Sequence, residues 1–224
     1  MGASFTLADS QTLEDLQVFL ARAARIEEGS VRLIAGSGVL AVYIAVFYPQ
    51  GLLDESPTVL GLRTVALMPG ADGSADTFDA VVPVRSLLSR IETAKAAGNT
   101  TISLPMEVNT ATWAAISPPK GGWHASGTTT APVLDAVARS GIDEVAAAIP
   151  TGTGEQIVRR VRSEVWSRPI PGLEHVPAGA GFAALGLGFL GDDEVRIFET
   201  GPWTRLTTQR GHVLVKRKAW TLAR

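Results

Sequence analysis

A charge-free apolar run from Leu33 to Tyr48 constrains the fold more than any other feature of this sequence. The run is shorter than the roughly 20 residues that a bilayer-spanning helix needs. Gly36-Ser37-Gly38 interrupts it near its start, and the residues that follow are rich in Val, Ile, Tyr and Phe, which favour strands. We therefore expect a buried hairpin whose second strand, Val39 to Phe47, is central in a sheet and covered on both faces.

The pattern around this hairpin predicts few helices and many consecutive strands. One apolar stripe favours a helix that begins at Asp9 or Ser10 and ends at Gly29, and a second helix begins near Val84 and ends at Gly98. The predicted order over residues 1–112 is β-α-β-β-β-β-α-β. Alternating β/α units, which are typical of parallel sheets, are missing, so we expect an α+β fold with mostly antiparallel sheets and helices packed on one face.

The second half of the sequence predicts helices followed by an antiparallel C-terminal meander. A helix behind Thr130 is expected to break at Gly141, a short helix continues through Val145, and a third helix covers residues 155–166. Short turns then separate four apolar segments that favour strands. These predicted strands are Phe182 to Leu190, Val195 to Glu199, Trp203 to Thr208 and His212 to Arg217.

Composition changes near the middle of the chain. All five Trp residues lie after residue 112. Residues 1–112 carry 7 Lys and Arg against 12 Asp and Glu, a net charge of −5, whereas residues 113–224 carry 13 against 10, a net charge of +3. We interpret this difference as two subdomains, 1–112 and 113–224.

The absence of cysteine excludes disulfides, a thiol nucleophile and cysteine-based metal or iron–sulfur sites. It is compatible with a reducing compartment, and the first residues lack the basic and apolar regions of a signal peptide, so we expect a cytoplasmic protein. The net charge of −2 gives no overall attraction to polyanions. Arg outnumbers Lys by 16 to 4, which a biased base composition explains without nucleic-acid binding.

Three glycine patterns match fragments of the dinucleotide-binding motif. They begin at Gly36, Gly179 and Gly186, and we interpret the last two as parts of a glycine-rich strand. Binding of the phosphates requires a helix N-terminus directly after the loop, and none is expected at these sites. Hairpin turns and close backbone packing explain the glycines better, and we expect no cofactor.

No constellation of acidic residues or histidines predicts catalysis or metal binding. The EF-hand pattern is not matched by the cluster of Asp72, Ser74, Asp76 and Asp79, which we interpret as a solvated loop. The three histidines, His124, His175 and His212, share no metal-ligand spacing, and no G-x-S-x-G nucleophile motif is present. We therefore predict no catalytic residue and no metal site, and the sequence favours a non-enzymatic protein.

Two segments are candidates for binding a ligand or a partner. Trp123 and His124 follow the Pro- and Gly-rich loop at residues 117–122, and large aromatic side chains on loops often anchor partners. The C-terminal segment is basic, with Trp203 and Trp220 interleaved. It could bind a polyanion or protect an edge strand from aggregation. The candidate site residues are Trp123, His124, Arg205, Arg210 and His212.

The sequence identifies no reaction, and three hypotheses remain. The first is a soluble, non-enzymatic interaction or scaffold protein that forms a homo-oligomer or binds an unidentified protein partner, with no membrane association. The second is RNA or DNA binding by the basic C-terminal meander, which we do not favour. The third is a small-molecule enzyme or carrier with a pocket near Trp123 and His124.

Overall fold

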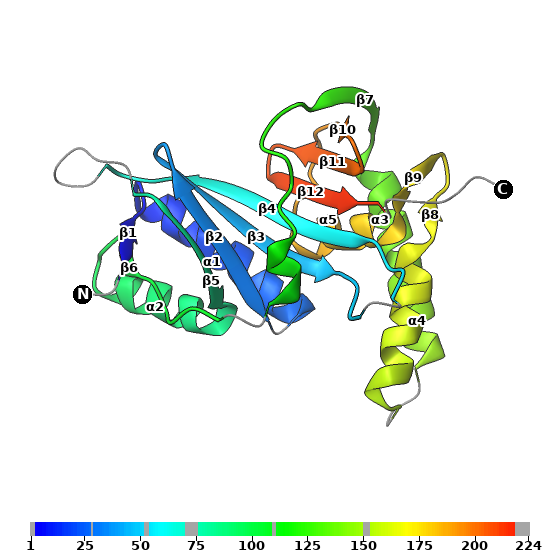
Figure 1. The fold of residues 1–224 in the computed structure, drawn as a ribbon, viewed down its shortest axis with the longest axis horizontal. Helices are drawn as coiled ribbons and strands as arrows, with labels where there is room; N and C mark the ends of the chain where they lie inside the picture. Colours follow the sequence, from blue (N-terminus) through cyan, green and yellow to red (C-terminus); the bar gives the residue numbers. More distant parts are fainter. Residues whose placement is uncertain are drawn as a thin grey trace. The chain divides into compact units, whose positions relative to one another are not determined.

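The computed structural model describes residues 3–27, 29–51, 54–69, 76–108, 111–149 and 153–217. The chain divides into two compact units (Figure 1). Unit 1 comprises Met1–Ala45 and Leu62–Ile116, and unit 2 comprises Val46–Gly61 and Ser117–Arg224. The predicted α+β class is confirmed, with antiparallel sheets and helices packed on one face.

Unit 1 contains a meander of three strands, an edge strand and two helices. The elements are β1 (Ser4–Thr6), α1 (Ser10–Ile26), β2 (Ser30–Gly36), β3 (Val39–Phe47), β4 (Thr58–Ala66), β5 (Phe78–Pro83), α2 (Val84–Ala96), β6 (Thr101–Ser103) and the 3-10 helix η1 (Thr112–Ala115). In the sheet the strand order is β5-β2-β3-β4, and the short strands β1 and β6 form a separate antiparallel pair.

Alternation of apolar residues places the core of unit 1. Val31, Leu33 and Ala35 of β2 are buried, while the residues between them are only half-buried on the other face. The apolar stripe of α1 is buried too, and Asp9 caps this helix by accepting a hydrogen bond from the backbone N–H of Thr12 at 2.7 Å. The predicted hairpin and both predicted helices of this half are confirmed, and β3 is central in the sheet. The expected cover on both faces of β3 is wrong, because Val39 is exposed and Ala41 and Tyr43 are only half-buried on the outer face.

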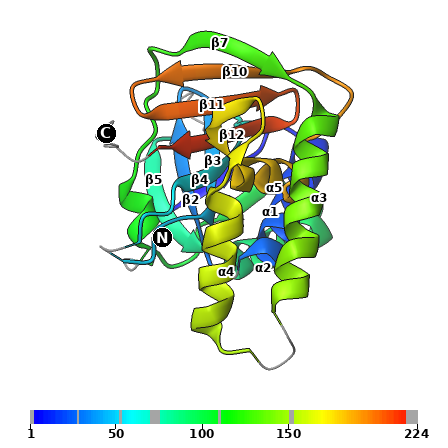
Figure 2. The same cartoon turned by 90° about the vertical axis from the view of Figure 1, so that its right-hand side faces the viewer.

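Unit 2 contains the same kinds of element in another chain order. Its strand order is β4-β12-β11-β10-β7, in which β4 contributes its first residues, and β8 pairs antiparallel with β9. Figure 2 shows β7, β10, β11 and β12 side by side, with the helices α3, α4 and α5 below them. The elements are β7 (His124–Thr129), α3 (Ala131–Ala148), α4 (Glu155–Ser167), β8 (Pro169–Ile170), β9 (Leu173–Pro177), α5 (Ala178–Gly186), β10 (Val195–Thr200), β11 (Trp203–Thr208) and β12 (Gly211–Lys216).

Two sequence predictions in unit 2 are wrong, and close helix packing explains both. The segment from Phe182 was expected to be a strand, but Ala178–Gly186 is the buried helix α5. A Cβ atom on Gly181 would lie 2.9 Å from the carbonyl oxygen of Leu134, so α5 approaches α3 more closely than any other residue would allow. The expected break at Gly141 is also absent, because the Trp166 ring packs directly against this glycine within a continuous α3.

The two units share one topology with their halves in opposite chain order. In unit 1 the segment β1-α1-β2-β3-β4 comes first and β5-α2-β6 second. In unit 2 the counterpart of the second segment, from β7 to β8, comes first, and β9-α5-β10-β11-β12 follows. The pairings correspond as well, since β5 pairs antiparallel with β2 as β7 does with β10, and β1 pairs with β6 as β9 does with β8.

Among the helices of the described residues, none has both the length and the apolar character that a membrane span requires.

Candidate interaction surface

The sheet register of unit 2 gathers several predicted site residues on one face. Phe198 of β10 lies opposite Arg205 of β11, and Arg196 lies opposite Thr207. Thr207 in turn lies opposite His212 of β12. Directly opposed residues in an antiparallel sheet project from the same face. We call Trp123, Arg196, Phe198, Arg205 and His212 the basic–aromatic patch.

Two aromatic rings hold the Arg205 side chain within this patch. Its guanidinium carbon lies 4.6 Å from the centre of the Trp123 ring and 4.7 Å from that of the Phe198 ring. Trp123 is itself fixed, because its indole N–H donates to the carbonyl oxygen of Pro119 at 3.1 Å. The guanidinium carbon of Arg196 lies 5.7 Å from the Phe198 ring, so both arginines contact aromatic faces.

The patch concentrates positive charge without acidic partners. Burial lowers the pKa of Arg205, and the neighbouring Arg196 cation lowers it further. The Nε atom of Arg205 is buried without a hydrogen-bond partner. Within the described parts of the chain, neither Arg196 nor Arg205 forms an ion pair with a carboxylate. Such a site favours an anionic group supplied from outside the patch.

His212 of β12 is half-buried and is neutral near pH 7. Burial lowers its pKa to about 4, and the Arg205 and Arg196 cations act in the same direction. Its Nδ1 atom is 3.1 Å from the hydroxyl oxygen of Thr207, so one hydrogen bond fixes the ring. His212 can therefore offer a neutral hydrogen-bonding group but no positive charge.

The other two predicted site residues lie elsewhere. His124 is exposed on the edge strand β7, opposite Glu199 of β10. Arg210 lies in the turn between β11 and β12, where its guanidinium donates to the carbonyl oxygen of Leu190 at 2.7 Å. Two further residues of the basic C-terminal segment, Lys218 and the interleaved Trp220, lie outside the described residues.

Sequence reasoning missed Arg196 and Phe198. Both follow a period of two within Val195–Thr200, in which Val195 and Ile197 are buried and the residues between them are not. This alternation was a usable signal, because it places Arg196 and Phe198 together on the outer face of a strand.

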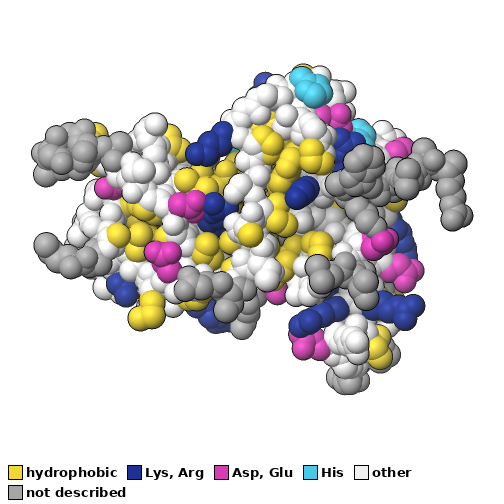
Figure 3. Space-filling model, in the orientation of Figure 1, with side chains coloured by type: hydrophobic (Ala, Val, Ile, Leu, Met, Phe, Trp, Pro, Cys, Tyr) yellow, Lys and Arg dark blue, Asp and Glu magenta, His cyan; other side chains and the backbone are white. Residues whose placement is uncertain are grey.

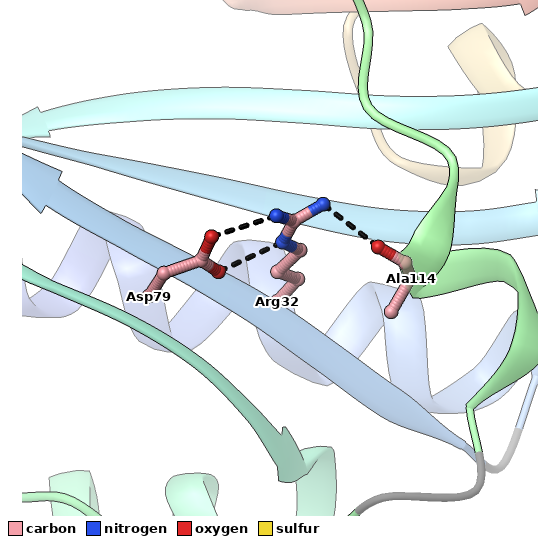
Figure 4. A network of polar contacts seen from close by, with 3 residues as sticks. All are labelled: Arg32, Asp79 and Ala114. Carbon is pink, nitrogen blue, oxygen red and sulfur yellow. Dashed lines mark hydrogen bonds and ion pairs between the residues drawn. The ribbon is translucent and has the colours of Figure 1, made fainter.

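The outer face of unit 1 also carries an arginine, and here the charge is neutralised internally. Arg32 of β2 donates from Nε and from a terminal nitrogen to the two carboxylate oxygens of Asp79 at 2.8 and 2.7 Å. Its other terminal nitrogen donates to the carbonyl oxygen of Ala114 at 2.7 Å (Figure 4). The hydrogen bond with Asp79 raises the pKa of Arg32.

No metal site is found among the described residues, in which no group of three or more His, Asp or Glu side chains could hold an ion. Of the acidic loop considered from the sequence, Asp79 is the partner of Arg32, while Asp72 and Ser74 lie outside the described residues.

Basic, acidic and hydrophobic side chains are interspersed on the surface drawn in Figure 3.

Comparison with solved structures shows the fold of DNA polymerase sliding clamps. The DNA polymerase III subunit beta from Pseudomonas aeruginosa matches with a TM-score of 0.50 at 15% identity, over 100% of this chain and 66% of that one. The Caulobacter crescentus pol III beta matches with a TM-score of 0.52 at 11% identity, over 98% of this chain and 67% of that one. The chain thus spans about two thirds of the clamp subunits that it resembles.

Two family models match the sequence. Residues 118–220 match the model described as Domain of unknown function (DUF8185), and residues 1–114 match the model described as Domain of unknown function (DUF8010). No curated protein sequence matches the chain. Because the second model covers half of the 224 residues, the chain belongs to the family described as Domain of unknown function (DUF8010).

Proposed function

We propose that this protein is a non-enzymatic, cytoplasmic scaffold that binds other macromolecules and associates with copies of itself. The observation that carries the proposal is its likeness to the DNA polymerase III beta subunits, at a TM-score of 0.52 for the Caulobacter crescentus protein. This likeness to subunits of DNA polymerase III supports a role in an assembly, and a DNA-related one in particular.

The side-chain chemistry supports the same proposal. Unit 2 holds two arginines, Arg196 and Arg205, against aromatic rings, a combination that is typical of interfaces. His212 is neutral and sits among cations, and among the described residues its recorded hydrogen-bond partner is the Thr207 hydroxyl, not a carboxylate that would orient it as a general base. Recognition therefore fits this patch better than proton transfer does.

Cross-linking in living cells, followed by mass spectrometry, tests the proposal. We expect the purified cross-linked protein to carry links to a second copy or to a recurrent macromolecular partner, and links in unit 2 should fall near the basic–aromatic patch. An Arg196→Glu variant should lose the partner that binds there, whereas Arg159→Glu, an exposed change on α4, should keep it. Recovery of the uncross-linked chain alone from every sample would contradict the proposal.

Nucleic-acid binding by the C-terminal meander is a second candidate, supported by Arg196 and Arg205 lying together without acidic partners. The measurement is binding of a labelled single-stranded oligonucleotide at several salt concentrations. This candidate requires affinity that falls steeply with salt and with the changes Arg196→Gln and Arg205→Gln. No binding at low salt removes it.

A further inference from the structure

The shared topology of the two units allows their edge strands to be compared directly. The edge strand β5 of unit 1 corresponds to the edge strand β7 of unit 2, and β2 corresponds to β10. The surroundings of an arginine on the outer face of one meander can therefore be compared with those of an arginine on the corresponding face of the other unit. Differences between these environments indicate what each unit supplies for itself.

Unit 1 contacts its edge strand with its own chain. The backbone N–H of Val108 donates to the carbonyl oxygen of Val81 in β5 at 2.8 Å, so the segment following β6 makes one backbone hydrogen bond to this edge. The chain then continues to Ala114, whose carbonyl accepts from Arg32 beside the Asp79 carboxylate. The carbonyl and the carboxylate satisfy the arginine, and the Val108 hydrogen bond occupies one position of the edge.

Unit 2 has the same arrangement of strands without these contacts. Residues 124–128 of β7 are all exposed, and no described residue outside the sheet donates a backbone hydrogen bond to this strand or accepts one from it. Proteins usually protect such an edge with Lys, Pro or a covering segment. The side chains of β7 are small apart from His124, so this strand itself offers little steric hindrance to another strand.

The distance between the edge and the arginines suits an added strand. Neighbouring strands lie about 4.8 Å apart, so a strand beside β7 would be two spacings from β10. Arg196 lies opposite Thr128, and Phe198 lies opposite Ala125, so only small side chains stand between Arg196 and the edge on this face. A Glu or Asp side chain from the added strand could reach across them to an arginine.

We propose that the edge of β7, together with Arg196, binds an extended segment of a partner protein with acidic side chains at alternate positions. The main chain of this segment adds a strand to the sheet, and the carboxylates on the outer face point toward Arg196. The inference rests on the proposed scaffold function and names the class of partner that one surface of it takes. It assigns to a partner the contacts that unit 1 makes internally.

A protein segment fits this surface better than a nucleic acid does. A peptide main chain can pair with the N–H and C=O groups of an edge strand, which a nucleic acid does not. The faces of Trp123 and Phe198 that contact Arg205 are already occupied by its guanidinium, which leaves less ring surface for bases. The overall charge of −2 also gives a polyanion no long-range attraction.

The test uses the full-length protein and a short labelled peptide in which Glu alternates with Thr. Binding is followed by fluorescence anisotropy, and hydrogen exchange is followed by mass spectrometry. We expect saturable binding, weakened about tenfold when Gln replaces the peptide's Glu residues, since charge-assisted hydrogen bonds are lost. The amides of residues 124–129 should exchange more slowly in the complex, because the added strand pairs with them.

Protein variants separate charge from folding. Arg196→Gln should weaken binding about tenfold, whereas Arg159→Gln, on the exposed face of α4, should not change it. A peptide that is N-methylated at alternate residues should also bind weakly, because it cannot pair with the edge. Since the Gln and N-methyl peptides need no variant protein, a folding defect cannot decide the result.

Three outcomes would overturn the inference. The first is equal affinity for the Glu and Gln peptides, and the second is binding that leaves exchange in β7 unchanged. The third is an oligo-dT probe that binds more tightly than the peptide and is lost on Arg196→Gln, which would assign the patch to nucleic acid. If the peptide does not bind but cross-linked partners are still found in cells, only this inference is rejected. If neither peptide binding nor cross-linked partners are found, the scaffold function is rejected as well.

Discussion

Arg32 and Arg205 are the same kind of residue on corresponding sheet faces, but their surroundings differ. Arg32 meets a carboxylate and a carbonyl, so its charge is satisfied within the chain. Arg205 meets two aromatic rings and another cation. The sequence could predict that Arg205 and His212 belong to a basic segment, but it could not predict this difference. Ion pairing depends on which residues the register and the loops bring opposite each arginine.

The lowered pKa of His212 predicts that stability depends on pH. Its pKa is about 4 in the folded protein and near 6.5 in the unfolded chain, so between these values the unfolded chain binds the proton and the folded protein does not. The stability linked to the neutral ring is complete above about pH 6.5 and is lost as the pH falls towards 4. The loss is at most roughly 3 kcal/mol, at about 1.4 kcal/mol per pH unit.

Urea unfolding of wild type and His212→Gln at several pH values measures this effect. The variant should lose much of the decline in stability between pH 6.5 and pH 4, because Gln does not titrate. His124→Gln, which changes an exposed residue, is the matched control and should follow the wild type. Identical pH profiles for wild type and His212→Gln would contradict the buried, neutral state of this ring.

Removal of the Asp79 charge should destabilise unit 1. Asn at this position keeps the shape but loses the charge and one of the two oxygens that accept from Arg32, whose side chain is only 16% exposed. We expect Asp79→Asn to lower the free energy of unfolding by about 1 kcal/mol, since water partly screens the pair. Asp135→Asn breaks the more exposed pair with Arg139 on α3 and should have a smaller effect in the same urea titration.

At the level of elements, periodicity predicted the helices that have one apolar face and failed where a helix is buried on all sides. The stripe of α1 follows the helical period, with Leu13, Leu16 and Leu20 buried. The helix α5 has no polar face, and its glycines have low helix propensity, so the same segment resembled a strand. Tertiary packing on α3 and α4 decides its conformation, and this packing is not visible in local sequence.

The glycine contacts of α5 give a test of that explanation. Ala is a better helix former than Gly by about 1 kcal/mol, so a helix held by propensity alone would gain stability from Gly181→Ala. Because the new Cβ would meet the carbonyl oxygen of Leu134 at 2.9 Å, we expect a net loss of about 1–3 kcal/mol instead. The control is Gly127→Ala, where a Cβ would meet nothing within 4 Å. Thermal unfolding distinguishes the two variants, and a stabilised Gly181→Ala would refute the packing argument.

For the whole molecule, composition indicated a division of the chain but not its topology. The two units cannot be recognised as a repeat along the sequence, because their corresponding elements occur in a different order. Residues Val46–Gly61 belong to unit 2, although the chain returns to unit 1 after them. This exchange depends on long-range strand pairing, which local patterns do not encode. The boundary between two subdomains at residue 112 therefore remains a prediction.

We propose that this protein binds macromolecules and does not convert a small one. Native mass spectrometry of the full-length protein, purified from its expression host at low salt, separates these two roles. We predict masses of the chain, of its multiples or of a complex with another macromolecule, because the arginines of the basic–aromatic patch lie against aromatic rings, a combination typical of interfaces. A stoichiometric small molecule or metal ion retained on the protein would contradict the claim and support an enzyme or carrier.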